Sequence, residues 1–123
     1  MEKVRPKLPD ALIEGELKEE ELFQNMVLRP VIKMQHDVLI LRVKSYFVSK
    51  SVMFNVMDKN KRALAIEQAF TNDNSFKKEI QGMILGQLNT SEYQLYLNYE
   101  RTMNKRIIQI VRNRMLDSTL HLA

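Results

Sequence analysis

The pattern of apolar and polar positions becomes helical at about Glu16 and stays helical to the end of the chain. Residues 1–15 hold two of the three prolines among charged residues, which favours an extended tail with Leu12 and Ile13 as an anchor onto the body. Three glycines and three prolines are too few for the frequent turns of an all-β fold. The sequence therefore predicts an all-α fold: an extended N-terminal tail, then a small bundle of four to five helices, residues 16–120, in a single domain.

Polar capping residues and one proline indicate where these helices begin and end. Pro30 lacks a backbone donor and restricts Arg29, so we expect a kink or a helix boundary there. The next helix is expected from Val31 to about Lys50, at the centre of the bundle. The predicted N-caps of the later helices are Asp58, then Asn72 or Asp73, then Asn89, which forms a capping-box-like pattern with Glu92.

The last helical pattern is long for a protein of this size. It extends from Thr90 to about Asp117, which is roughly 42 Å of helix. A globule of this chain length has a radius of gyration of only about 14 Å. The helix is therefore expected either to break near Asn98–Asn104 or to project toward a partner.

Five charged or titratable residues lie on one side of the helix that is expected around Pro30, and we call them the charged arc. Its members, within about 100° of one another, are Arg29, Lys33, His36, Asp37 and Lys44. Arg29, Lys33 and Asp37 are spaced four residues apart, as in a solvated ladder of charges. Neighbouring residues on a helix point about 100° apart, so His36 and Asp37 do not form a catalytic dyad. The arc is interpreted as a solvated edge of the helix.

Arg42 lies roughly opposite that arc, among apolar positions, together with Gln35. An arginine there needs either an acidic partner or a route to water, because an unpaired buried charge is costly. Glu100 falls inside the apolar arc of the last helix. We therefore hypothesise an Arg42–Glu100 ion pair between the two longest helices. The alternative is that Arg42 extends past the edge of the core to water.

The polar face of the last helix is the best candidate for a functional surface. Its members are Asn98, Arg101, Lys105, Gln109, Arg112 and Asn113, with Arg106 at the border. Arginine, lysine and amide side chains suit phosphates or a carboxylate-rich partner surface. The predicted partner contacts are Arg101, Lys105, Gln109 and Arg112, with Arg29 and Lys33 from the charged arc. Tyr93, Tyr96 and Tyr99 point toward the core, so the interleaved aromatic residues of a single-strand binder are missing.

Gly82 and Gly86 are four residues apart and would share one helix face. Because glycine costs a helix about 1 kcal/mol, the pair suggests the close approach of another backbone. The alternative makes Gly86 the C-cap before the turn at Asn89.

The composition gives little support to catalysis. The chain has no cysteine and two histidines, His36 and His121, in no metal-binding or nucleophile motif. We therefore expect no enzymatic activity, cofactor or metal. The N-terminus lacks the apolar core of a signal peptide, and charges interrupt the most apolar run, which favours a cytoplasmic protein without a membrane span. The net charge of +4 permits an anionic partner.

Three segments of the chain resemble a small bacterial family of uncharacterised helical proteins whose members often carry the label glyoxalase. They are FQNMVLRPVIK at 23–33, GMILGQLNTSEY at 82–93 and NKRIIQIVRNRM at 104–115. The resemblance runs from about Leu22 to Met115 and implies a helical fold. Metal-dependent glyoxalases of the βαβββ type hold their metal with histidines and glutamates on strands, which this sequence does not predict.

The expected function is that of an adaptor or accessory subunit that binds another protein through the tail or the basic helix face. The alternative is an RNA- or DNA-associated protein that uses Arg101, Lys105 and Arg112. Either one could form homo-oligomers.

Overall fold

The computed structural model describes residues 19–122, and all the regular structure there is helical. The elements are α1 (Glu19–Phe23), η2 (Gln24–Leu28), α2 (Arg29–Met34), α3 (His36–Ser49), η3 (Phe54–Val56), α4 (Lys59–Asn72), α5 (Asn74–Leu85), α6 (Thr90–Asn98), α7 (Glu100–Asp117) and η4 (Thr119–Leu122). The all-α prediction is confirmed. Counting α1, η2 and α2 as one helix gives six helices in this part of the chain, rather than four to five. The predicted tail, 1–15, lies outside the described residues.

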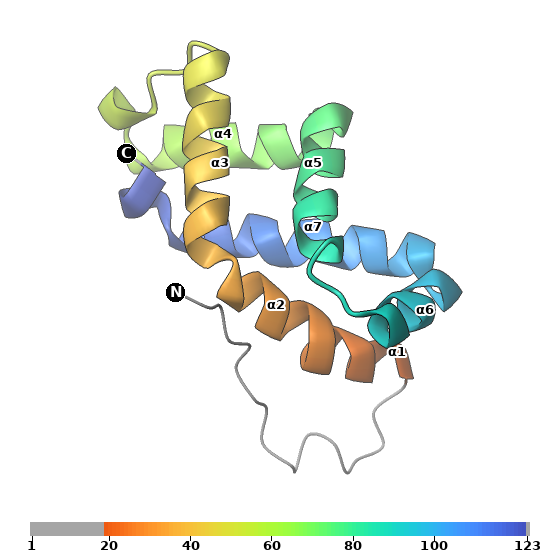
Figure 1. The fold of residues 1–123 in the computed structure, drawn as a ribbon. Helices are drawn as coiled ribbons and strands as arrows, with labels where there is room; N and C mark the ends of the chain where they lie inside the picture. Colours follow the sequence, from red (N-terminus) through yellow and green to blue (C-terminus); the bar gives the residue numbers. More distant parts are fainter. Residues whose placement is uncertain (1–18, 123) are drawn as a thin grey trace.

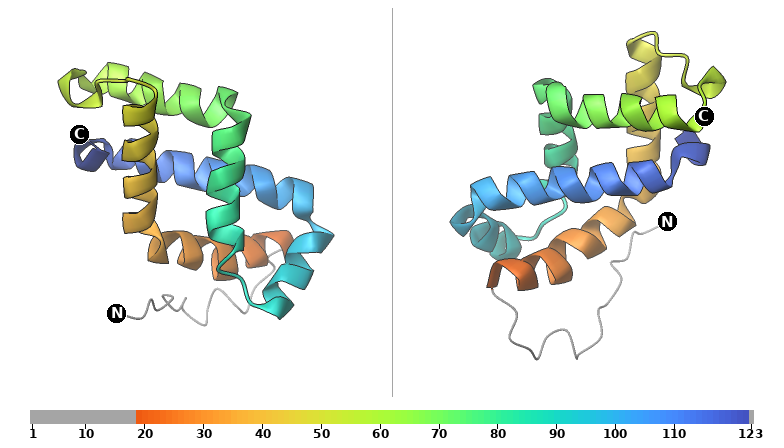
Figure 2. Two further views of the ribbon diagram at one scale, coloured as in Figure 1. Left: turned by 45° about the horizontal axis from the view of Figure 1, so that its top comes forward. Right: turned by 180° about the vertical axis from the view of Figure 1, so that it is seen from behind.

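The helices cross one another in two layers (Figure 1). Helices α3 and α5 lie in one layer, and α4 and α7 pass behind them at a steep angle, as both further views show (Figure 2). The helix formed by α1, η2 and α2 lies beside α7 at the lower edge of Figure 1. No helix within residues 19–122 combines the length and the apolar character needed to cross a membrane.

The boundary expected at Pro30 is a change from π-helix to α-helix just before it, and the first helix does not end there. A π-helical turn, Gln24–Leu28, precedes it, and the Arg29 N–H donates to the carbonyl of Gln24, five residues back. Proline is tolerated there because it occupies one of the first positions of α2. A residue in the first turn of an α-helix does not need to donate a backbone hydrogen bond. The first helix ends at Gln35, whose backbone leaves helical geometry at φ −90° and ψ 7°. The helix expected from Val31 to Lys50 is therefore divided.

The predicted N-caps are confirmed. The side chain of Asp58 accepts a hydrogen bond from the Lys61 N–H, and that of Asp73 accepts one from the Phe76 N–H. Asn89 and Glu92 form the reciprocal bonds of a capping box, both at 2.9 Å. Each cap satisfies a backbone donor that the first turn of a helix leaves open.

The long C-terminal pattern breaks at Tyr99, within the expected Asn98–Asn104 region. Tyr99 adopts φ −133° and ψ 29°, which separates α6 from α7. The Tyr96 hydroxyl donates to Asn104 Oδ1 at 2.7 Å and ties the two helices together across the break. Folding back at this point lets α6 pack on α7 instead of projecting into solvent.

Helix α7, rather than the predicted 31–50 helix, is the centre of the packing. Met103, Ile107, Val111 and Met115 recur every four residues and are fully buried. The helix contacts α2, α4, α5 and α6. One apolar stripe on α7 therefore holds most of the fold together.

Neither glycine lies where the backbone of another helix approaches closely, which their spacing had suggested. Gly82 is exposed, and a Cβ atom built there would meet nothing within 4 Å. Gly86 is the C-cap of α5, as in the alternative prediction, and a Cβ there would lie 3.1 Å from the Gly82 carbonyl oxygen. The predicted close approach of another backbone at Gly82 is wrong.

The hypothesised Arg42–Glu100 ion pair is also wrong. Arg42 Nε lies 3.3 Å from Glu79 Oε2 on α5, and the two side chains are 34% and 53% exposed. Glu100 is exposed at the first position of α7. Helical periodicity placed both residues near apolar positions, but the break at Tyr99 turns Glu100 out to solvent.

We predict that Glu79→Ala and Glu100→Ala each reduce the free energy of unfolding by less than about 1 kcal/mol, because ion pairs at exposed positions contribute little. Urea denaturation of both variants measures this. A double-mutant cycle of Arg42→Ala with Glu79→Ala should give a small coupling, and with Glu100→Ala none. A coupling with Glu100 larger than that with Glu79 would contradict the observed pairing.

Candidate functional site

A polar cleft lies between the first helix and the C-terminal half of α7. It has a volume of about 490 Å³ and carries three arginines, one histidine and one acid. We call it the basic cleft, and its lining residues are Gln24, Arg29, His36, Arg106, Gln109, Ile110, Asn113, Arg114, Asp117 and Ser118. The helix break at Gln35 places His36 at its edge, opposite the last two turns of α7.

Arg114 and His36 form the most specific contact of the basic cleft. The guanidinium Nε of Arg114 donates to Nδ1 of His36 at 3.0 Å, across 78 residues of sequence. An imidazole nitrogen that accepts a hydrogen bond must be unprotonated, so this contact requires the neutral ring with its proton on Nε2. The neutral imidazole therefore orients a positive guanidinium without cancelling its charge.

Each of the other two arginines donates to a neutral amide, but Arg106 also has a carboxylate partner. Arg106 Nη1 donates to the side-chain oxygen of Gln24 at 2.9 Å, and Glu20 lies 3.8 Å from Nη2. Arg29 Nε donates to Asn25 Oδ1 at 3.3 Å. Within residues 19–122, neither Arg29 nor Arg114 makes an ion pair. Two guanidinium groups are thus positioned and still able to bind an anion.

The electrostatics of the basic cleft act on His36. Partial burial, and then the charge of Arg114, lower the pKa of His36 from its ordinary value of 6.5, and His121 adds a smaller lowering. Asp37 opposes them. An anion bound beside the arginines would favour the protonated ring, because opposite charges stabilise one another.

The basic cleft takes in only two of the six predicted partner contacts, Arg29 and Gln109. Arg101 and Lys33 are exposed elsewhere, and Lys105 lines a separate hollow with Lys77 and Gln81. Arg112 faces α4, where its Nη1 lies 4.0 Å from Glu67 Oε2. The polar face of α7 is therefore divided between two flanks that meet different helices.

His36 was predicted as part of a solvated arc, and Arg114 was not among the predicted site residues. A signal was present on α7, where Arg106, Ile110, Asn113 and Asp117 recur at the spacing of one helix side. That spacing cannot indicate which other helix faces them. The prediction of a solvated arc holds for Arg29, Lys33 and Asp37, which are exposed, but His36 is partly buried against Arg114.

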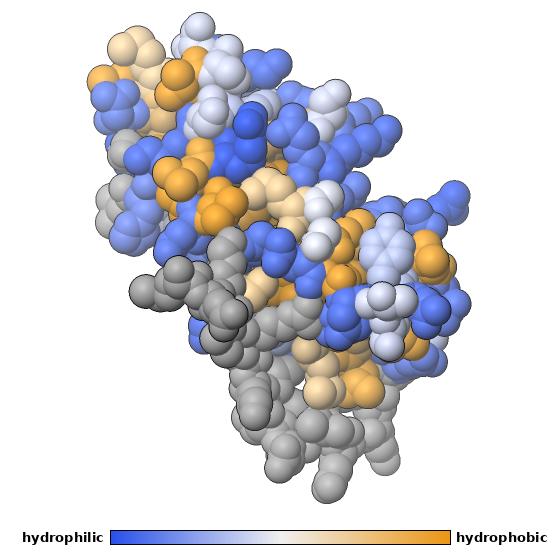
Figure 3. All heavy atoms as spheres, in the orientation of Figure 1, coloured by the Kyte–Doolittle hydropathy of each residue, from blue (hydrophilic) through white to orange (hydrophobic). Residues whose placement is uncertain are grey.

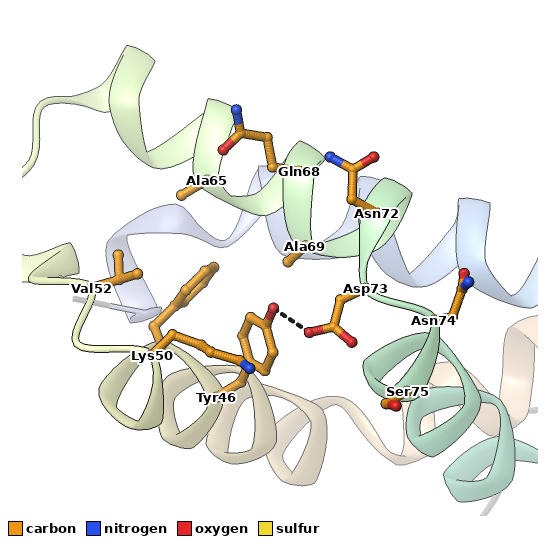
Figure 4. A pocket seen from close by; sticks show the side chains of 11 residues that line it. Tyr46, Lys50, Val52, Ala65, Gln68, Ala69, Asn72, Asp73, Asn74 and Ser75 are labelled. Carbon is orange, nitrogen blue, oxygen red and sulfur yellow. Dashed lines mark hydrogen bonds between the residues drawn. The ribbon is translucent and has the colours of Figure 1, made fainter.

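A larger open hollow, about 650 Å³, lies where α3 meets the start of α5 (Figure 4). The Tyr46 hydroxyl donates to Asp73 Oδ2 at 2.8 Å, and the Tyr46 ring stacks on Phe76 with centroids 4.1 Å apart. Lys50 Nζ lies 5.8 Å from the centre of the same ring. Asp73 is also the N-cap of α5, so these contacts join α3 to that cap. We interpret the hollow as a structural junction.

The chemistry available in the basic cleft is the recognition of an anion. Arginine forks match the oxygens of carboxylates and phosphates, and the amides of Gln109 and Asn113 add donors and acceptors. Within the described part of the chain, no group of three histidine, cysteine or acidic residues could hold a metal ion.

Comparisons of the chain with protein-family models, curated proteins and solved structures found no match. The resemblance to the helical bacterial family therefore stays a prediction.

We predict that Tyr46 ionises late and that this affects stability at high pH. Burial and the bond to Asp73 raise the pKa of Tyr46 from 10.0 to about 12. A raised pKa means that the folded state favours the neutral phenol. The resulting stability is complete below pH 10 and is lost as the pH rises toward 12.

The pKa values of Tyr96 and Tyr99 are raised as well, so spectrophotometric titration should show a late step that Tyr46→Phe reduces by one tyrosine and that Tyr93→Phe, at an exposed position, retains in full. Tyr46→Phe should also cost about 1 kcal/mol of stability at neutral pH, through the lost hydrogen bond. A late step of undiminished amplitude in Tyr46→Phe would contradict the assignment.

We predict that His36 weakens the fold in mild acid. Its folded pKa lies below the ordinary 6.5, so its stabilising effect is complete above that pH and is lost as the pH falls below it. Denaturation midpoints between about pH 7 and pH 5 measure the effect. His36→Gln retains an acceptor for Arg114 without titrating, so it should reduce this pH dependence. An unchanged dependence in His36→Gln would show that His36 does not cause it.

Proposed function

We propose that this protein is a non-enzymatic adaptor or accessory subunit, and that the basic cleft receives an acidic segment of a partner protein. The observation that carries the proposal is the pair of guanidinium groups, Arg29 and Arg114, oriented by Asn25 and His36 without a neutralising carboxylate among residues 19–122. Side chains held in place lose less entropy when a ligand binds, which favours specific recognition.

The volume and the charge pattern support a short peptide segment as the ligand. A site of about 490 Å³ has the size of small-ligand sites and can accept a few side chains. Asp117 lines the same cleft and Glu20 lies beside Arg106. A mixed-charge protein segment can place acids on the arginines and a donor on Asp117, whereas a continuous phosphate backbone would be repelled by both carboxylates.

The nucleic-acid alternative receives less support from the geometry. It relies on Arg101, Lys105 and Arg112, but Arg112 lies beside Glu67 on the α4 side, while Lys105 lines another hollow. Of the three nearby tyrosines, Tyr96 is buried and bonded to Asn104, while Tyr93 is exposed, so the prediction that it points toward the core is wrong. Stacked bases need cations on one surface together with exposed aromatic rings. Here the three cations do not converge, and the Tyr96 ring is in the core.

We predict that an acidic peptide binds the basic cleft. Two variants that lose the same net charge, one in the cleft and one at Arg101 and Lys105, distinguish binding in the cleft from binding elsewhere on α7. Arg29→Ala/Arg114→Ala should weaken binding of a glutamate-rich peptide by about tenfold or more, since charge-assisted hydrogen bonds are lost. Arg101→Ala/Lys105→Ala removes the same net charge elsewhere and should bind nearly as well as wild type. NMR titration with the peptide, followed at the His36 imidazole, measures both the affinity and the place of binding.

Bound peptide should raise the pKa of His36, and an oligonucleotide of similar charge should bind more weakly and with a steeper salt dependence. Equal losses in both variants would indicate non-specific attraction and would contradict the cleft. Tighter binding of the oligonucleotide, lost in Arg101→Ala/Lys105→Ala, would favour the nucleic-acid function instead. Affinity purification from cells with and without nuclease, using the same two variants, then tests for a natural protein partner.

A further inference from the structure

Helix α3 carries an apolar stripe on the side away from the core. Its members, Val38, Leu41, Ser45 and Val48, are exposed, with Leu41 at 66% and Val48 at 77%. We call this set the α3 stripe. Leu39, Val43 and Phe47 form the opposite, buried side of the same helix.

The spacing of the α3 stripe is that of a helix–helix seam. Its residues alternate by three and four positions, the a and d pattern by which two helices pack side by side. Apolar atoms are visible at the surface where α3 lies in Figure 1 (Figure 3). Scattered apolar residues on a surface are ordinary, but three apolar side chains on one side of one helix, interrupted only by Ser45, indicate a contact.

One flank of the stripe carries an acid and a base that can pair with the same two residues of a second copy. Asp37 and Lys44 lie on the same flank, seven residues and roughly 10 Å apart. If a second α3 lies antiparallel across a two-fold axis near Ile40, Asp37 of each copy comes level with Lys44 of the other. The same placement brings Val38 of one copy close to Leu41 of the other. Val48 comes level with Lys33, beyond the break at Gln35, so the seam is centred on Val38 and Leu41. Arg42, on the opposite flank, is already paired with Glu79.

The surface beside the stripe is also shaped to receive a side chain. A shallow hollow next to Leu41 is lined by Asp37, Ile40, Lys44, His36 and His121. In a two-fold arrangement, a protruding Leu41 from each copy can enter the hollow of the other, since such an interface uses the same patch twice.

We propose that the α3 stripe is a self-association surface, through which two copies of this chain pack α3 against α3 in antiparallel orientation. A single helix pair buries less area than a standard interface, so the dimer is weak and forms in the range of roughly 1 µM to 1 mM. His36 lies at the border between this surface and the basic cleft, but Arg29 and Arg114 line the basic cleft alone, so the proposal does not depend on the proposed function.

Sedimentation velocity across that concentration range tests the proposal. The wild-type chain should pass from monomer to dimer, and Leu41→Ser should raise the dissociation constant by about tenfold or more. Asp37→Lys and Lys44→Asp should each have an effect of similar size, because each places two like-charged pairs across the seam. Lys78→Asp, a charge reversal at an exposed position of α5, is the matched control and should dimerise like wild type. Circular dichroism checks that each variant stays helical.

Mixing the two charge variants tests the antiparallel register. In a mixed dimer of Asp37→Lys with Lys44→Asp, both pairs across the seam are attractive again, so a heterodimer should form although neither variant dimerises well alone. The double variant Asp37→Lys/Lys44→Asp should regain self-association. A wild-type chain that is monomeric throughout the range, or a dimer that ignores these substitutions, would overturn the proposal. Loss of the dimer in Arg29→Ala/Arg114→Ala alone would place the interface at the basic cleft instead, and would also overturn it.

Discussion

The structure depends on one apolar stripe on α7. Met103, Ile107, Val111 and Met115 are completely shielded from water, and α2, α4, α5 and α6 all contact this helix. Burial of such side chains is the dominant favourable term in folding. Because the stripe orients α7 within the bundle, it also decides where the polar flanks of α7 point. One flank faces the first helix and completes the basic cleft, while the other places Arg112 near Glu67 on α4.

The basic cleft illustrates how a charge can be held in place and kept available. A carboxylate beside each arginine would fix its position but would also neutralise it. Here Arg114 is oriented by His36 and Arg29 by Asn25, which are uncharged acceptors. The neutral imidazole also ties this arrangement to pH, since a protonated ring cannot accept the bond from Arg114. The hydrogen bond between Arg114 and His36 therefore orients the guanidinium, leaves its charge available and makes the arrangement sensitive to pH.

The basic cleft and the α3 stripe have opposite physical character. The cleft is polar and positively charged, which suits an acidic ligand, whereas the stripe is apolar with one self-complementary charged flank. A dimer through α3 would carry two copies of the cleft. Two linked sites bind a partner with two acidic segments more tightly than either site alone, provided that the partner can span them.

The sequence by itself determined the helical class and the local starts of the helices. Asp58, Asp73 and Asn89 were predictable as caps because each bonds to a backbone group three residues away. The break at Tyr99 is one of the two outcomes that the length of the helical pattern allowed, the other being projection toward a partner. Only the tertiary structure decided which distant groups meet, as in Arg42 with Glu79 or Arg114 with His36, and that Leu41 faces water. The physical reason is that helical periodicity defines the faces of a helix, while packing against other helices decides which face is buried.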